Sequence, residues 1–215
     1  MVGLRCIAEL HGLQMDLPTG APVRPRGSGS AGLPEWMRRV TLASPRGDVS
    51  RAGLAIHVHK SEDVADLTAE LVRQETGQVL YRAPVDPGTG FTRMTIPHEV
   101  AARLEIGGTY CLCLRQKGAE GQLTSVFLLK AEAPPEEPLE DADPVHARML
   151  RIARLLDAGY AAEAFAGVVE LATEHPEQAL PWRLGLAALE RMALLQSPLY
   201  LELMGKYQEA RDGGR

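Results

Sequence analysis

The sequence predicts an α+β fold in which an antiparallel β-sandwich is followed by a small α-helical region. Short segments that alternate apolar and polar residues fill residues 34–131, and segments with apolar residues at helical spacing fill residues 145–215. An acidic, proline-rich stretch separates the two. A chain of 215 residues, 45% hydrophobic and 24% charged, is large enough for two small globular domains of this kind.

The first 33 residues are expected to form an N-terminal segment and a flexible arm. Residues 17–33, LPTGAPVRPRGSGSAGL, combine prolines, glycines and serines with almost no apolar periodicity. The preceding segment has Glu9, His11 and Asp16 among its apolar residues, and so lacks the unbroken apolar core of a secretory signal. The chain has no run of eighteen apolar residues, and we expect no membrane span.

Cysteine content and charge limit the compartment and the class of partner. Cys6, Cys111 and Cys113 are an odd set without metal-finger spacing, which favours a reducing compartment, and we expect a cytoplasmic protein. Residues 1–131 hold 15 Lys and Arg against 13 Asp and Glu, and the remainder holds 8 against 15. Because neither part has the clustered basic charge of a nucleic-acid-binding surface, we expect no nucleic-acid partner.

Residues 34–131 predict a β-sandwich of seven short strands separated by turns such as SPRGD, ETGQ and DPGTG. Alternating strands need a second sheet to cover their apolar faces, which favours two packed sheets. Arg46-Gly47-Asp48 is interpreted as a polar turn between the first two strands. The expected strands are residues 38–43, 53–60, 66–74, 78–82, 91–97, 109–115 and 123–130.

The stretch LEIGGTYCLCL, residues 104–114, specifies the kind of sandwich. Its leucine, glycine and tyrosine at three-residue intervals resemble the tyrosine corner of immunoglobulin-like and fibronectin type III domains, in which the phenol hydroxyl bonds back to the preceding turn. That resemblance implies that the second and sixth expected strands lie in opposite sheets.

Strand alternation then predicts the direction of each side chain. If Tyr110 points inward, Cys111 and Cys113 lie on the outer face, and the same parity in the second strand leaves His57 and His59 outside, facing water. The HVH and CLC pairs would otherwise form a four-ligand zinc set. Because they are expected on opposite sides of the sandwich, we predict no metal site and no cofactor.

Residues 132–144 predict an acidic, proline-rich linker, with no basic residue from 131 to 144. Apolar stripes then predict four helices, of which the last is the weakest. Gly159 is expected to end the first helix, and Pro176 follows the second. The expected helices are residues 146–158, 160–174, 180–195 and 199–210.

Two family resemblances follow from these residues. LLDAGYAAEAFAGVVELATEHPEQ, residues 155–178, resembles a tetratricopeptide-type hairpin, and at most one and a half such repeats are present. The hairpin must therefore bury its apolar face on the sandwich, the last helix or a partner chain.

From about Pro22 to Tyr200, the order of arm, β-region with LEIGGTYCLCL, hairpin and ALERMALLQSPLY is similar to the uncharacterised, mainly cyanobacterial domain-of-unknown-function family 928. That resemblance implies an architecture and no activity.

No arrangement of residues indicates catalysis. There is no phosphate-binding loop or nucleophile elbow, and His98 beside Glu99 is interpreted as a capped turn. Glu62, Asp63 and Asp66 lack the spacing and the glycine of a calcium loop. We therefore predict a protein that is not an enzyme.

The sequence favours a non-catalytic protein-interaction or adaptor protein that binds a protein partner through the helical tail, the sandwich surface, or both. Trp36 beside Arg38 and Arg39 is typical of a contact surface, although a tryptophan that covers the sandwich edge fits the same pattern. His57 and His59 are the other candidate contact residues. A ligand-binding accessory or regulatory subunit of an enzyme, and a structural subunit of a larger complex, are the alternatives.

Overall fold

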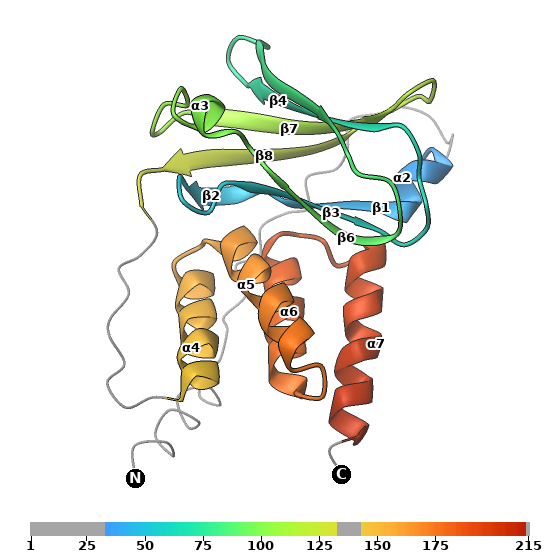
Figure 1. Cartoon of the computed structure of the whole chain (residues 1–215), viewed down its shortest axis with the longest axis vertical. Helices are drawn as coiled ribbons and strands as arrows, with labels where there is room; N and C mark the ends of the chain where they lie inside the picture. Colours follow the sequence, from blue (N-terminus) through green and yellow to red (C-terminus); the bar gives the residue numbers. More distant parts are fainter. Residues whose placement is uncertain (1–32, 133–142, 214–215) are drawn as a thin grey trace.

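The computed structural model describes residues 33–132 and 143–213, which form two sheets and a set of helices (Figure 1). The α+β class predicted from the sequence is confirmed. Residues 1–32 of the predicted N-terminal segment and arm, and residues 133–142 of the predicted acidic linker, lie outside the described residues.

The described strands form a three-stranded sheet in the order β1-β3-β6 and a five-stranded sheet in the order β2-β8-β7-β4-β5. All neighbours are antiparallel except β2 and β8, which are parallel. The short helices α2 (Glu35–Arg39) and α3 (His98–Ala101) precede β1 and β7. The strands are β1 (Val40–Ser44), β2 (Gly47–Ser50), β3 (Ala55–Lys60), β4 (Leu67–Arg73), β5 (Val79–Pro84), β6 (Gly90–Thr95), β7 (Thr109–Gln116) and β8 (Leu123–Lys130).

All seven predicted strands are present, and the eighth, β2, was missed. The prediction of a polar turn at Arg46-Gly47-Asp48 was wrong, because Gly47 and Asp48 begin β2 and pair with Phe127 and Leu128 of β8. A strand of only GDVS has too few residues to show alternation. Pro45, which follows a cis peptide bond, and Gly47, with φ of 69°, are also residues typical of turns.

The two sheets enclose one apolar core, as strand alternation predicts. Inward-facing residues from β3 and β7, including Ile56, Val58, Leu112 and Leu114, are fully buried in it. The prediction that the second and sixth predicted strands lie in different sheets is correct, since β3 belongs to the three-stranded sheet and β7 to the five-stranded sheet.

Tyr110 forms the predicted hydrogen bond to the turn before its strand. The backbone N–H of Glu105 donates to the Tyr110 hydroxyl at 2.7 Å, and that hydroxyl lies 3.4 Å from the Glu105 carbonyl oxygen. The tyrosine ring also packs on Phe127, with ring centroids 5.6 Å apart. The polar end of this buried side chain is therefore satisfied while its ring fills the core.

The four helices of the second half are α4 (Pro144–Asp157), α5 (Ala161–Glu174), α6 (Ala179–Arg191) and α7 (Pro198–Gly213). Asp143 caps α4 by accepting from the backbone N–H groups of Val145 and His146. Gly159, with φ of 89°, supplies the left-handed residue that ends α4, as predicted. Consecutive helices pack against each other around a second apolar core.

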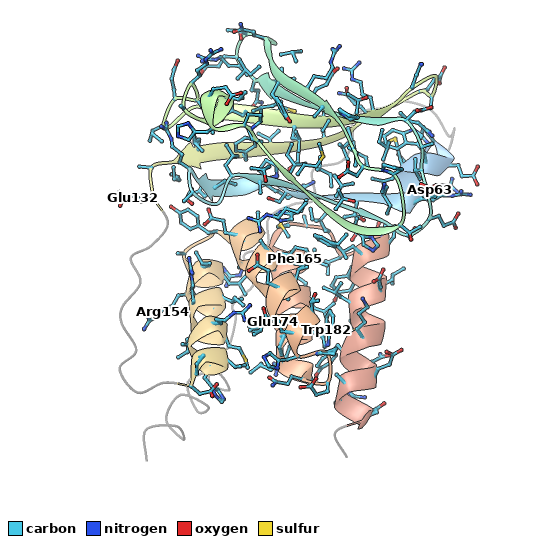
Figure 2. The ribbon with its side chains drawn as sticks, in the orientation of Figure 1. Asp63, Glu132, Arg154, Phe165, Glu174 and Trp182 are labelled. Carbon is cyan, nitrogen blue, oxygen red and sulfur yellow. The ribbon has the colours of Figure 1, made fainter. Side chains whose placement is uncertain are left out.

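The helices lie against the outer face of the three-stranded sheet (Figure 1). Ala43 of β1 is fully buried and belongs to the helical core, and Phe91 of β6 packs against the same cluster. Figure 2 labels Phe165 near the sheet, and its ring centroid lies 5.5 Å from that of Phe91. The apolar face of α5 is therefore buried against the sheet and the neighbouring helices.

Candidate functional site

The predicted contact residues before β1 have different environments. Trp36 is only 5% exposed, belongs to the core between the sheets, and donates its Nε1–H to the Glu120 carbonyl oxygen at 3.1 Å. Arg39 pairs with Glu35 and with Glu62. Arg38 is exposed and, unlike Arg39, forms no ion pair with a described residue. The tryptophan therefore covers the edge of the core and is not an exposed contact.

The expectation that His57 and His59 face water was wrong. Both point away from the core between the sheets, as their parity predicts, but they are 4% and 2% exposed because the helices cover this face. Both rings lie close to Phe91, with centroids 6.0 Å and 5.9 Å from it. The two histidines are thus part of an internal contact between sheet and helices, and are not surface contact residues.

Burial determines the charge of both rings. It lowers the pKa of His57 to about 4, with a smaller contribution from the positive charge of Arg93. Burial also lowers the pKa of His59, although Glu202 opposes the shift. Both rings are therefore neutral near pH 7. The Nε2 atom of His59 lies 2.7 Å from the Glu202 carboxylate, and the Nδ1 atom of each histidine has no hydrogen-bond partner among the residues that the structure describes.

Further polar contacts hold the helices on the sheet. The carboxylate of Glu163 in α5 accepts from the backbone N–H of Ser50, and Arg93 of β6 pairs with Glu170 at 3.0 Å. Gly53 leaves the space that Glu163 occupies, because a Cβ atom there would lie 2.3 Å from the Glu163 Cδ atom. A cleft of about 200 Å³ remains along this contact.

The cysteine pair lies on the other sheet. Cys111 and Cys113 are on the outer face of β7, as predicted, with their sulfur atoms 3.5 Å apart, although Cys113 is buried rather than exposed. The hydrogen bond from Cys111 lowers the pKa of the Cys113 thiol to about 6 and raises that of Cys111. Within residues 33–132 and 143–213, no group of three or more His, Cys, Asp or Glu side chains is placed to hold a metal ion.

A groove of about 520 Å³ lies beside β1, and we call it the β1 groove. Its walls come from α2, β1, the start of β8, and the connection from α6 to α7 (residues 192–197) with the first turn of α7. Most of its surface is apolar, and exposed Leu33 and Leu201 lie at its rim. Arg38 and Arg46 also line it, while no Asp or Glu of the described residues does.

Two polar groups in the β1 groove have no partner in the described part of the chain. The Thr41 hydroxyl is buried without a hydrogen bond, and so is the Nε atom of Arg46. Burial lowers the pKa of the Arg46 guanidinium, and no carboxylate from residues 33–132 or 143–213 offsets this cost. Buried unpaired polar groups are uncommon and costly, so a pair of them in one groove marks a candidate binding site.

The groove brings together one predicted residue, Arg38, and two that sequence reasoning missed, Thr41 and Arg46. No local signal identified the latter two. Thr41 fits an ordinary strand, and Arg46 follows a proline in what reads as a turn. They line a site only because the chain near Leu194, far away in sequence, folds back beside them.

Neither a protein-family model nor a curated protein matches this chain. No helix in the described part of the chain is long and apolar enough to cross a membrane.

Proposed function

We propose that this chain is a non-catalytic protein-interaction or adaptor protein whose protein partner binds in the β1 groove. The observation that carries the proposal is the groove itself, which is open to a partner, mainly apolar and bordered by exposed leucines. Apolar pockets with a few polar groups favour binding. Arginine, present here as Arg38 and Arg46, is enriched among the residues that dominate protein interfaces.

The proposed architecture is consistent with this role. We propose that the sheets form an immunoglobulin-like sandwich, since β8-β7-β4-β5 follows the order of the sheet that contains the sixth strand of that fold, and Tyr110 makes the expected corner contact. Such sandwiches serve as binding modules in many unrelated proteins, which is support by analogy of fold.

We also propose that the helices are related to tetratricopeptide repeats. The α4–α5 hairpin turns at Gly159, and α6 packs closely on α5 because Gly185 leaves space beside Val168 and Leu203. Repeats of this kind present surfaces for partner chains. The relationship to domain-of-unknown-function family 928 is proposed on the order of segments alone.

Site-specific photo-crosslinking tests the proposed function. A photoreactive amino acid replaces Leu201 at the rim of the groove or, as the control, Val79 on β5; these side chains are 69% and 44% exposed. Crosslinking is carried out in cells that naturally express the protein, and each captured protein is then purified and tested for direct binding. We expect a distinct protein to be captured from position 201 and to bind the purified chain.

The control position determines how the result is interpreted. Capture of the same proteins from both positions, or of none from position 201, would refute the proposal. Capture of a second copy of this chain from position 201 would instead favour a structural subunit of a larger assembly.

A further inference from the structure

We propose that the partner of the β1 groove is an acidic, leucine-containing peptide segment whose carboxylate pairs with Arg46. This inference rests on the proposed function and adds the chemistry of the partner. The groove supplies three kinds of recognition for such a segment: a guanidinium without a partner among the described residues, apolar walls, and a strand edge that pairs with no other described strand.

The guanidinium of Arg46 determines the charge of the partner. Among the described residues, its buried Nε–H has no acceptor, it forms no ion pair, and no Asp or Glu lines the groove. Buried arginine normally has a hydrogen-bonded anionic partner, because burial of an unpaired charge is costly. An incoming carboxylate removes that cost and forms a charge-assisted hydrogen bond in the groove. Arg38, exposed at the same groove, adds a second positive charge.

The apolar walls determine which uncharged side chains the partner carries. The surface of the groove is mainly apolar, with Leu42, Leu123 and Leu194 among its lining residues and Leu201 at its rim. These walls take aliphatic side chains of leucine size, which gain by leaving water. A small hydrophilic anion would leave the walls in contact with solvent, so the partner must carry both kinds of group.

The strand edge favours a peptide over a small amphipathic acid. Among the described strands, β1 is the end strand of its sheet and pairs only with β3, so none of them uses its other edge. End strands have backbone donors and acceptors that an added peptide can use. Thr41, on this strand and in the groove, adds a buried hydroxyl without a partner. A peptide supplies backbone groups, a carboxylate and apolar side chains together.

Fluorescence anisotropy with the full chain tests the proposal. The probes are short fluorescein-labelled peptides of Leu and Ser in which one Glu is moved through every position, and the controls carry Gln in place of that Glu. We expect at least one Glu peptide to bind wild-type protein about tenfold or more tighter than its Gln control, as removal of a hydrogen bond to a charged group predicts. The same preference is expected to disappear in Arg46→Met and to persist in part in Arg46→Lys.

Folding is measured in parallel. Arg46→Met replaces an unpaired, partly buried charge by an apolar side chain, so its urea midpoint is expected to equal or exceed that of the wild type. Equal binding of Glu and Gln peptides, no binding by any peptide, or an unchanged preference in Arg46→Met would overturn the proposal. So would self-association of the wild type that Leu201→Glu abolishes in sedimentation, because a second copy would then occupy the groove.

The two proposals fail in distinguishable ways. If position 201 captures a partner whose affinity does not change in Arg46→Met, the adaptor function stands and the acidic-peptide chemistry is wrong. If position 201 captures nothing, the adaptor function itself is wrong.

Discussion

Acidification is expected to destabilise this fold through His57, which is 4% exposed between β3 and the helices. Burial, with a contribution from Arg93, lowers the pKa of its ring from 6.5 to about 4. The folded protein therefore resists protonation of His57, and the unfolded chain binds more protons between these two pH values. The contribution of His57 to stability is complete above about pH 6.5 and is lost progressively as the pH falls towards 4.

The size of this loss follows from the two pKa values. One unit corresponds to about 1.4 kcal/mol, so the shift from 6.5 to about 4 limits the total effect to about 3 kcal/mol. At pH 5 the unfolded ring is almost fully protonated and the folded ring is not, and the free energy of unfolding is expected to fall by about 2 kcal/mol. Domains of this size are stable by only about 5–15 kcal/mol, so such a loss is measurable.

Urea unfolding near pH 7.5 and pH 5 measures the effect. Fluorescence of Trp36 and Trp182 reports on the sheets and the helices, because one lies in each apolar cluster. His57→Gln removes the titrating ring, and His98→Gln, at an exposed position, is the matched control. Wild type and His98→Gln are expected to lose about 2 kcal/mol more than His57→Gln between the two pH values. An equal loss in all three proteins would refute the assigned role of His57.

Three further perturbations test other parts of the structure. Tyr110→Phe removes the hydrogen bond to the turn before β7 and is expected to lower the free energy of unfolding by about 1 kcal/mol; a change within measurement error would contradict this. Gly185→Leu is expected to cost about 1–3 kcal/mol, while Gly205→Leu, with open space at its Cβ, costs nothing or stabilises; equal effects would disprove the close packing. Cys111→Ala is expected to raise the pKa of Cys113 from about 6 towards its ordinary value. A pH titration of thiolate absorbance measures this change, and an unchanged titration would contradict the assigned hydrogen bond.

Strand alternation predicted which way the side chains of β3 point, and it did not predict what covers them. Ile56 and Val58 face the core between the sheets, and His57 and His59 face away from it, as expected. A two-residue period contains no information about the element packed on the second face. Two histidines on that face predicted that it is exposed to water, because a strand that is buried on both sides is normally a nearly continuous apolar run. All six residues of β3 are nevertheless buried, including its two imidazoles.

The β1 groove was beyond sequence reasoning for a related reason. Helical spacing predicted α6 and α7, and strand alternation predicted β1, but the groove forms where the connection between these helices meets that strand. Its position depends on how the helices lie on the sheet. The hairpin pattern predicted that its apolar face packs on the sandwich, the last helix or a partner chain, and the contacts of α5 and α7 with β1 show that the sheet takes part.

The contact between sheet and helices therefore determines the shape of the candidate site. Glu202 of α7 lies 2.7 Å from His59 of β3, and its sequence neighbour Leu201 lies at the rim of the β1 groove. A change that moves α7 on the sheet must also move this rim relative to Thr41 and Arg46. Burial disfavours the charged form of His59 and the Glu202 carboxylate favours it, so this pair ties α7 to β3.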